Sequence, residues 1–205
     1  MDTLISDRKN LPDHLVRSIF VDRGHQFVGR LKWDLCVTPN GYETDEYDDC
    51  SSKYLAVHRL GEHLGSCRVR PITSSTMITD HFHAVFPSAS EFLRHQKGRL
   101  YELTRFCRSP VISVDESRLM LGLLARLLDS FRDQYNLSGF VAIVFPQVAR
   151  FLDTIGVRYV VVSKSQMDGR TVLLICITHA EKVEQKAKYL PSEAKILRTG
   201  LHLVA

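Results

Sequence analysis

The sequence predicts an α/β fold, a sandwich of helices packed around a mixed β-sheet. Short apolar runs bounded by turn residues are typical of strands, while longer segments with apolar residues at helical spacing are typical of helices. The two kinds of segment alternate along 205 residues, and no repeat or low-complexity tract interrupts them. Such an order of elements indicates a sandwich around one sheet, and the length fits a single domain over residues 1–205.

The first half of the chain supplies three expected strands and one helix. Residues 3–6 form a short strand, and residues 15–27 place Leu15, Ile19 and Phe20 on one helical face. A polar, irregular segment follows over 38–53. Two strands, 54–59 and 64–70, are then expected on either side of a turn at Gly61.

The second half of the chain contains the clearest helix. Ser113 and Glu116 match a capping box, and apolar residues repeat at helical spacing from there to Tyr135. The other expected elements are short helices over 77–97 and 146–155 and strands over 100–108, 140–144, 158–163 and 172–178. Periodicity is weak after residue 182, where we expect a mobile helical tail over 182–205.

Composition and charge indicate a globular protein with an uneven charge distribution. Apolar residues make up 44% of the chain and charged residues 24%, for a net charge of +4. Five carboxylates lie within residues 43–49, while basic residues recur over 94–108 and 182–198. A basic surface of this kind favours a phosphorylated cofactor, an acidic carrier protein or nucleic acid as partner, although a solvated basic face explains it equally well.

The cysteines and the N-terminus predict a cytoplasmic protein that does not enter a membrane. The five cysteines are widely spaced and include no Cys-x-x-Cys pair, which argues against a disulfide framework or a zinc site. The first residues lack the apolar core of a signal peptide, and no apolar run approaches the length of a membrane span. His81 and His83 have no third ligand at useful spacing, so we expect no metal.

Arg23 makes the strongest demand on the fold. It lies on the apolar face of the expected helix between Phe20 and Phe27, where an unpaired cation is costly. The carboxylates of the acidic run, among them Asp45 and Asp48, are the nearest supply of partners along the chain. Together with the charged residues of two later strands, this predicts a polar, charged cavity inside the core.

Two strands carry further charged residues. Alternation places Arg68 and Arg70 on one strand face, where guanidinium groups suit a carboxylate or phosphate ligand, unless they form a structural ion pair. Glu102 shares a face with Thr104 among apolar neighbours, so it is either a general base with a raised pKa or a surface carboxylate. Arg105 points to the other face unless a β-bulge turns it.

Trp33, the only tryptophan, fits either a wall of a binding pocket or a core position. The chain contains no Gly-x-Gly-x-x-Gly motif, no P-loop and no recognisable nucleophile motif.

Taken in series, these residues resemble the LuxI-type acyl-homoserine lactone synthases. The motifs are Arg23-x-x-x-Phe27 followed by Trp33, Asp45-x-x-Asp48, Cys67-Arg68-x-x-Pro71, Phe86-Pro87 and Glu102-x-x-Arg105-Phe106, in family order over residues 15–160. The resemblance implies a fold like the GNAT acetyltransferases: a three-layer α/β/α sandwich around a twisted, mostly antiparallel mixed sheet.

The resemblance also implies the reaction. Family members acylate the amine of S-adenosylmethionine from an acyl thioester and close the lactone with release of methylthioadenosine, so S-adenosylmethionine is a substrate and no cofactor is expected. Glu102 is the implied base and Arg105 orders the charged cluster. The residues implied to bind S-adenosylmethionine are Arg23, Phe27, Trp33, Asp45, Asp48 and Arg68.

In this family the acyl chain lies between the strand carrying the glutamate and the next strand, so Thr104, Phe106 and Val144 are the expected pocket residues. Members that prefer 3-oxo chains often have a threonine near Val144; because residues 141–145 carry no hydroxyl, we expect a chain without a 3-oxo group. The donor is an acyl carrier protein or acyl-CoA, and basic residues over 94–99 and at Arg150 suit either.

Two other classes compete with this interpretation. A GNAT acyltransferase acting on another amine would carry a glycine-rich pyrophosphate loop after the central strand, but residues 105–113 contain no glycine. A binding module for nucleic acid would leave the arginine on the apolar helix face unexplained. We therefore expect neither nucleic acid nor membrane as a partner.

Overall fold

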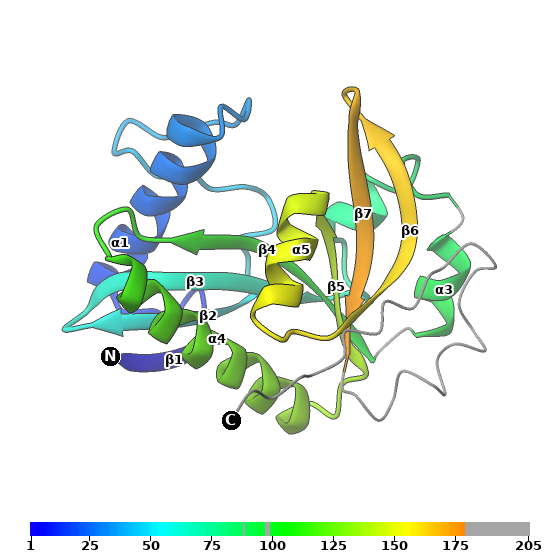
Figure 1. Ribbon diagram of the computed structural model, residues 1–205. Helices are drawn as coiled ribbons and strands as arrows, with labels where there is room; N and C mark the ends of the chain where they lie inside the picture. The colour runs from blue at the N-terminus through cyan, green and yellow to red at the C-terminus, as the bar shows by residue number, and fades with distance from the viewer. Residues whose placement is uncertain (88, 97–98, 179–205) are drawn as a thin grey trace. The chain divides into compact units, whose positions relative to one another are not determined.

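The computed structural model describes residues 1–87, 89–96 and 99–178. Its seven strands form one mixed sheet in the order β1-β2-β3-β4-β5-β7-β6 (Figure 1). The pairing of β4 (Leu100–Arg108) with β5 (Gly139–Val144) is parallel, whereas the pairings β1–β2, β2–β3, β5–β7 and β6–β7 are antiparallel. The expected mixed, mostly antiparallel sheet is thereby confirmed, and the expected tail over 182–205 lies outside the described residues.

The chain divides into two compact units that are described separately. Unit one comprises residues 1–70 and 103–135, and unit two comprises the described residues within 71–102 and 136–178. The expectation of a single domain over 1–205 stays a prediction.

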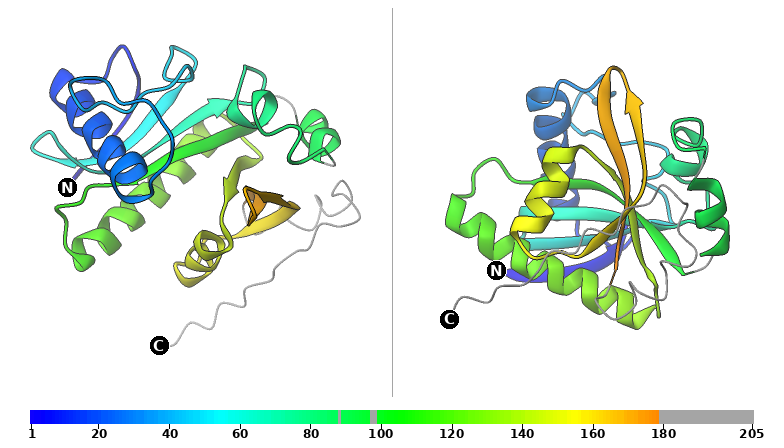
Figure 2. Two further views of the ribbon diagram at one scale, coloured as in Figure 1. Left: turned by 90° about the horizontal axis from the view of Figure 1, so that it is seen from above. Right: turned by 45° about the vertical axis from the view of Figure 1, so that its right-hand side comes forward.

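Unit one is built on β1 (Asp2–Asp7), β2 (Lys53–Arg59) and β3 (Glu62–Pro71). Helices α1 (Asp13–Arg23) and α4 (Val114–Gln134) lie on opposite faces of these strands (Figure 2). The apolar core under α1 is formed by Leu11, Leu15, Ile19, Phe20, Tyr54 and Ala56. Leu15, Ile19 and Phe20 are the residues that the helical periodicity placed on one face, because the pattern that predicts the helix also defines its buried side.

The expected helix over 15–27 ends earlier than its apolar pattern indicates. The α-helical part stops at Arg23 and continues as a π-helix, η1 (Gly24–Arg30). A π-helix widens the turn and occurs frequently at functional sites. Here it carries Phe27, and the chain then leads to Trp33.

Unit two contains β5, β6 (Tyr159–Met167) and β7 (Arg170–Ile177) with the helices α2 (Met77–Asp80), α3 (Ala89–His95) and α5 (Pro146–Thr154). The turn expected at Asp168 and Gly169 is confirmed: both residues have positive φ, 50° and 71°, as a tight hairpin requires. The strand before this turn runs four residues further than the sequence predicts. Lys164 and Gln166 are polar, so the end of this strand lacks the apolar run by which the sequence predicts a strand.

Helix α4 begins with the capping box that the sequence predicts. The Ser113 hydroxyl accepts from the Glu116 amide at 3.2 Å, and the Glu116 carboxylate accepts from the Ser113 amide at 2.9 Å. That backbone amide, helped by the guanidinium of Arg59, lowers the pKa of Glu116 to about 2.

Replacing Ser113 with alanine is expected to lower the free energy of unfolding by about 1 kcal/mol, because one amide of the first turn loses its partner. Urea unfolding followed by circular dichroism measures the change. Ser130→Ala, an exposed serine on the same helix, is the control and should change stability by less than about 0.5 kcal/mol. Equal stability of the two variants would contradict a stabilising cap.

Among the described residues, no helix has both the length and the apolar composition needed to cross a bilayer.

Candidate functional site

The acidic run reaches the end of α1 because Gly24 lets the chain approach closely. A Cβ at Gly24 would lie 2.7 Å from the carbonyl oxygen of Gly41, too close for any side chain. One step further, the amide of Glu43 donates to the carbonyl of Phe20 at 3.1 Å. These backbone contacts fix the start of the acidic run beside Arg23.

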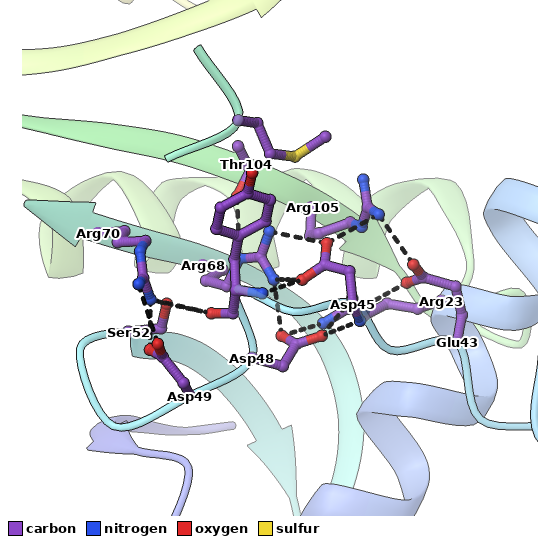
Figure 3. A network of polar contacts seen from close by, with 12 residues as sticks. Arg23, Glu43, Asp45, Asp48, Asp49, Ser52, Arg68, Arg70, Thr104 and Arg105 are labelled. Atoms are coloured by element: carbon purple, nitrogen blue, oxygen red, sulfur yellow. Dashed lines mark hydrogen bonds and ion pairs between the residues drawn. The ribbon is translucent and has the colours of Figure 1, made fainter. Parts of the chain in front are cut away.

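Arg23 is fully engaged by two carboxylates (Figure 3). Its Nε donates to Glu43 at 2.6 Å, and its two terminal nitrogens donate to the two oxygens of Asp48, each at 2.9 Å. The side chain is only 1% exposed. The partner that the sequence predicted for this buried cation is therefore confirmed, and it is a pair of carboxylates.

Arg68 in β3 extends the same network. Its guanidinium donates to Asp48 at 2.9 Å, to Asp45 through both terminal nitrogens, one of them at 3.0 Å, and to the hydroxyl of Thr104 at 3.1 Å. Like Arg23 it is 1% exposed. The Thr104 contact ties β4 to the cluster.

Arg105 completes the cluster through an irregularity in β4. Its φ of 52° is left-handed, a conformation that costs a non-glycine residue on the order of 1–3 kcal/mol. The guanidinium reaches Glu43 and Asp45, at 2.9 Å each. A regular strand would turn this side chain to the opposite face from Thr104, so the left-handed residue provides the break in alternation that brings Arg105 to the cluster.

The cluster balances three guanidinium groups against three carboxylates. Its members are Arg23, Arg68, Arg105, Glu43, Asp45 and Asp48. Equal numbers matter because burial penalises each charge unless a partner compensates it.

The pKa values within the cluster follow from this pairing. Burial works against the charge of Arg23, but Asp48 and then Glu43 outweigh it and raise its pKa. Burial likewise opposes ionisation of Asp48, yet Arg23 and then Arg68 hold its pKa well below the usual range. Tyr54 donates to Asp48 at 2.6 Å, and burial together with that carboxylate raises the pKa of the phenol. Arg23 and Asp48 therefore stay ionised near neutral pH.

Arg70 forms a separate structural pair. It donates to Asp49 through both terminal nitrogens, one of them at 2.9 Å, and one of these nitrogens also donates to Ser52 at 3.2 Å. The guanidinium of Arg70 is the largest contribution that lowers the pKa of Asp49. The interpretation of Arg70 as half of a structural ion pair agrees with this geometry.

Phe27 and Trp33 form an aromatic pair beside the cluster. Their rings stack with centroids 5.0 Å apart and an interplanar angle of 15°. The guanidinium of Arg105 lies 5.4 Å from the centre of the Phe27 ring. Trp33 is 36% exposed, so the alternative that it is a core residue is wrong, and its indole offers an accessible apolar surface.

Glu102 lies in unit two and is held by the first turn of α2. One carboxylate oxygen accepts from the amide of Ile78 at 2.7 Å and the other from the amide of Met77 at 3.2 Å. The residue is 1% exposed, so the alternative of a surface carboxylate is wrong. A capping box from Thr76 fixes this short helix, so the orientation of the carboxylate is set by backbone groups.

The three residues expected in an acyl pocket have different environments. The Thr104 hydroxyl is used by Arg68, the side chain of Phe106 is 39% exposed, and Val144 is half-buried opposite Leu173 in β7. Their role around an acyl chain stays a prediction.

Sequence reasoning missed Glu43 and Tyr54 as site residues. A count of charges could have found Glu43, because Arg23, Arg68 and Arg105 need three carboxylate partners and only two aspartates were named. Tyr54 gave no signal, because a tyrosine at the start of an apolar strand is typical of a core position.

Comparison with known proteins places this architecture in one family. The autoinducer synthase family model matches residues 8–187. An acyl-homoserine-lactone synthase of Aliivibrio fischeri is 27% identical over 157 residues, covering 74% of this chain and 78% of the relative.

Two solved structures share the fold. TofI, in a ternary complex with an inhibitor and MTA, aligns with a TM-score of 0.69 at 24% identity over 87% of this chain and 91% of TofI. BjaI, a CoA-dependent acyl-homoserine lactone synthase with SAM and isopentyl-CoA, aligns with a TM-score of 0.67 at 18% identity over 92% and 89%. The expected GNAT-like fold is confirmed, and the chain belongs to the autoinducer synthase family.

Proposed function

We propose that this protein is an acyl-homoserine-lactone synthase, which acylates the amine of S-adenosylmethionine and then closes the homoserine lactone. Membership of the autoinducer synthase family supports the class of activity. The observation that carries the proposal is the buried cluster of three arginines and three carboxylates, bordered by the exposed face of Trp33.

The cluster and the aromatic pair suit a cationic substrate. Asp45 is the most exposed of its carboxylates, with 11% of the side chain accessible, compared with 4% for Asp48 and 1% for Glu43. We assign to Asp45 the attraction of the ammonium and sulfonium charges, while the stacked rings of Phe27 and Trp33 provide an apolar wall with cation–π attraction for the sulfonium.

Arg23 and Arg68 act in this proposal through the other members of the cluster. Both side chains are 1% exposed and their nitrogens already bind carboxylates or a hydroxyl. They orient Asp45 and Asp48. Asp48 adds negative charge beside the substrate without contacting it, and Arg105 forms ion pairs with both Glu43 and Asp45. Direct contact of either buried arginine with the substrate carboxylate stays a prediction.

The first step forms an amide. An ammonium is not nucleophilic, so one proton must leave before the nitrogen attacks the thioester carbonyl, and Glu102 accepts that proton through water. The C–N bond forms, the C–S bond of the thioester breaks, and the second proton of the nitrogen accompanies the leaving thiolate as a thiol.

The second step closes the ring. The carboxylate oxygen of the acylated substrate attacks the γ-carbon that bears the sulfonium. The new C–O bond completes the lactone, and the electron pair of the broken C–S bond stays on sulfur, which leaves as neutral methylthioadenosine. This step needs no proton transfer.

The acyl donor in this proposal is an acyl carrier protein or acyl-CoA, and its chain lacks a 3-oxo group. The absence of a hydroxyl in residues 141–145 supports the second point, since no side chain there can donate a hydrogen bond to a 3-oxo oxygen. The structure of BjaI, which has the same fold, contains isopentyl-CoA. A CoA-linked chain bound to a protein of this fold supports an acyl thioester as the donor.

Mass spectrometry of organic extracts tests the proposal. Cells of a host without such lactones, expressing this chain, should accumulate an acyl-homoserine lactone with an unmodified 3-position. The same host expressing Glu102→Gln at equal protein level should accumulate at least about 100-fold less. Extracts of the wild-type strain that contain an N-acylated amine but no lactone would instead support a different amine acyltransferase.

A further inference from the structure

Unit two contains a cavity of about 270 Å³ next to the helices α2 and α3. Helix α3 is labelled beside β6 in Figure 1. Its walls include the apolar side chains of Ile78, Phe82, Phe86 and Leu93. The volume is just below the range of about 300–1,000 Å³ that is usual for ligand sites, and it exceeds the roughly 150 Å³ of apolar cavities known to bind benzene. An apolar ligand of modest size therefore fits.

The lining of this cavity also has a polar part. Arg94, which is cationic, and His83 contribute to it, and both residues are exposed. His83 is already hydrogen-bonded, through Nδ1, to the carbonyl of Asp80 at 3.2 Å. Arg94 forms no ion pair with any carboxylate within residues 1–87, 89–96 and 99–178. A guanidinium without such a partner beside an apolar cavity is suited to an anionic group attached to an apolar chain.

We propose that this cavity binds a medium-length alkyl chain ending in a carboxylate, with the chain between Phe82 and Leu93 and the carboxylate on Arg94. A methylene group takes about 30 Å³, the volume that a water molecule occupies in the liquid, so the cavity of about 270 Å³ holds up to about nine chain atoms. Octanoate meets both requirements. The site differs from the family's acyl pocket, which is expected between β4 and β5.

Occupation of the cavity bears on Glu102. The side chain of Ile78 lines the cavity, and its amide donates to the Glu102 carboxylate at 2.7 Å. A bound chain therefore contacts the residue that holds the proposed base, and octanoate should change kcat. That consequence rests on the proposed function, whereas the binding itself does not.

Isothermal titration of octanoate into the full chain tests the binding. We expect saturation at one molecule per chain. Arg94→Gln should weaken binding about three- to tenfold, because an exposed charge-assisted hydrogen bond is lost. Leu93→Trp should abolish binding by filling the cavity. Arg126→Gln, which removes an exposed arginine on α4, should bind as wild type.

1-Octanol separates the two parts of the site, since its binding should depend on Leu93→Trp and not on Arg94→Gln. Thermal melting confirms that each variant is folded before titration. The proposal is overturned if octanoate shows no saturation, or if Arg94→Gln and Leu93→Trp both bind it as wild type does. Competition between octanoate and the acyl donor would overturn the separation from the acyl pocket, and an unchanged kcat would overturn the link to Glu102.

Discussion

Replacing Glu102 with glutamine is expected to lower kcat for lactone formation by about 10²- to 10⁴-fold, because the variant cannot take a proton from the substrate amine. The two amide donors of α2 hold the wild-type carboxylate in one orientation. Glutamine keeps the size of the side chain but directs an NH₂ group at one of these amides, so a loss of about 1–3 kcal/mol in stability accompanies the loss of rate.

Steady-state kinetics with a saturating acyl thioester measures this effect, using only protein shown to be folded by circular dichroism. The KM for S-adenosylmethionine should change little, which separates a base from a residue that merely supports the pocket. Glu91→Gln, an exposed carboxylate on α3, is the matched control and should retain wild-type rates. If Glu102→Gln turned over within threefold of wild type, another group would be the base.

Replacing Arg23 with methionine is expected to lower the free energy of unfolding by about 3–5 kcal/mol. The substitution keeps an unbranched side chain in the core but leaves Glu43 and Asp48 buried with one cation fewer. Arg17→Met is the control, because it removes an exposed arginine from the same helix and should cost less than about 0.5 kcal/mol.

The destabilisation should depend on pH in a defined direction. The pKa of Asp48 in the folded protein is below its unfolded value of about 3.9, so its contribution to stability is complete above that pH and declines as the pH falls toward the folded pKa. The difference between wild type and Arg23→Met should therefore be largest near neutral pH and shrink below about pH 4. Urea unfolding at pH 7 and pH 3.5 measures it; a difference that grows on acidification would contradict the pairing.

Sequence patterns predicted the elements well where local signals agree. The bounds of β4 were predicted to the residue, and the capping box at Ser113 and the turn at Gly169 formed where the sequence placed them. In each case a side-chain or backbone preference acts over a few residues, so short-range information is sufficient.

Features that depend on contacts distant in the sequence were harder to predict. The left-handed conformation of Arg105 is stabilised by ion pairs with Glu43 and Asp45, about sixty residues earlier in the chain. The π-helix after Arg23 follows an apolar pattern that an α-helix satisfies equally well. The need for a partner of Arg23 was predictable from burial cost, but the division of the carboxylates among three arginines was not.

Burial also changed the roles within the candidate site. The sequence predicted carboxylate partners for Arg23 and left Arg68 open between an anionic ligand and a structural ion pair, whereas the structure surrounds both with carboxylates at 1% exposure. A buried, neutralised network resists rearrangement, since removing any member leaves a charge uncompensated. We infer that it holds Asp45 rigidly beside the aromatic wall of Phe27 and Trp33.

The central claim is that one protein both acylates S-adenosylmethionine and closes the lactone. It is tested most directly with purified protein, an acyl thioester and S-adenosylmethionine labelled with ¹³C at its carboxyl carbon. Mass spectrometry should find one labelled acyl-homoserine lactone for each methylthioadenosine released, and neither product without the thioester. Release of thiol with formation of an open-chain amide, or methylthioadenosine without a labelled lactone, would contradict the claim.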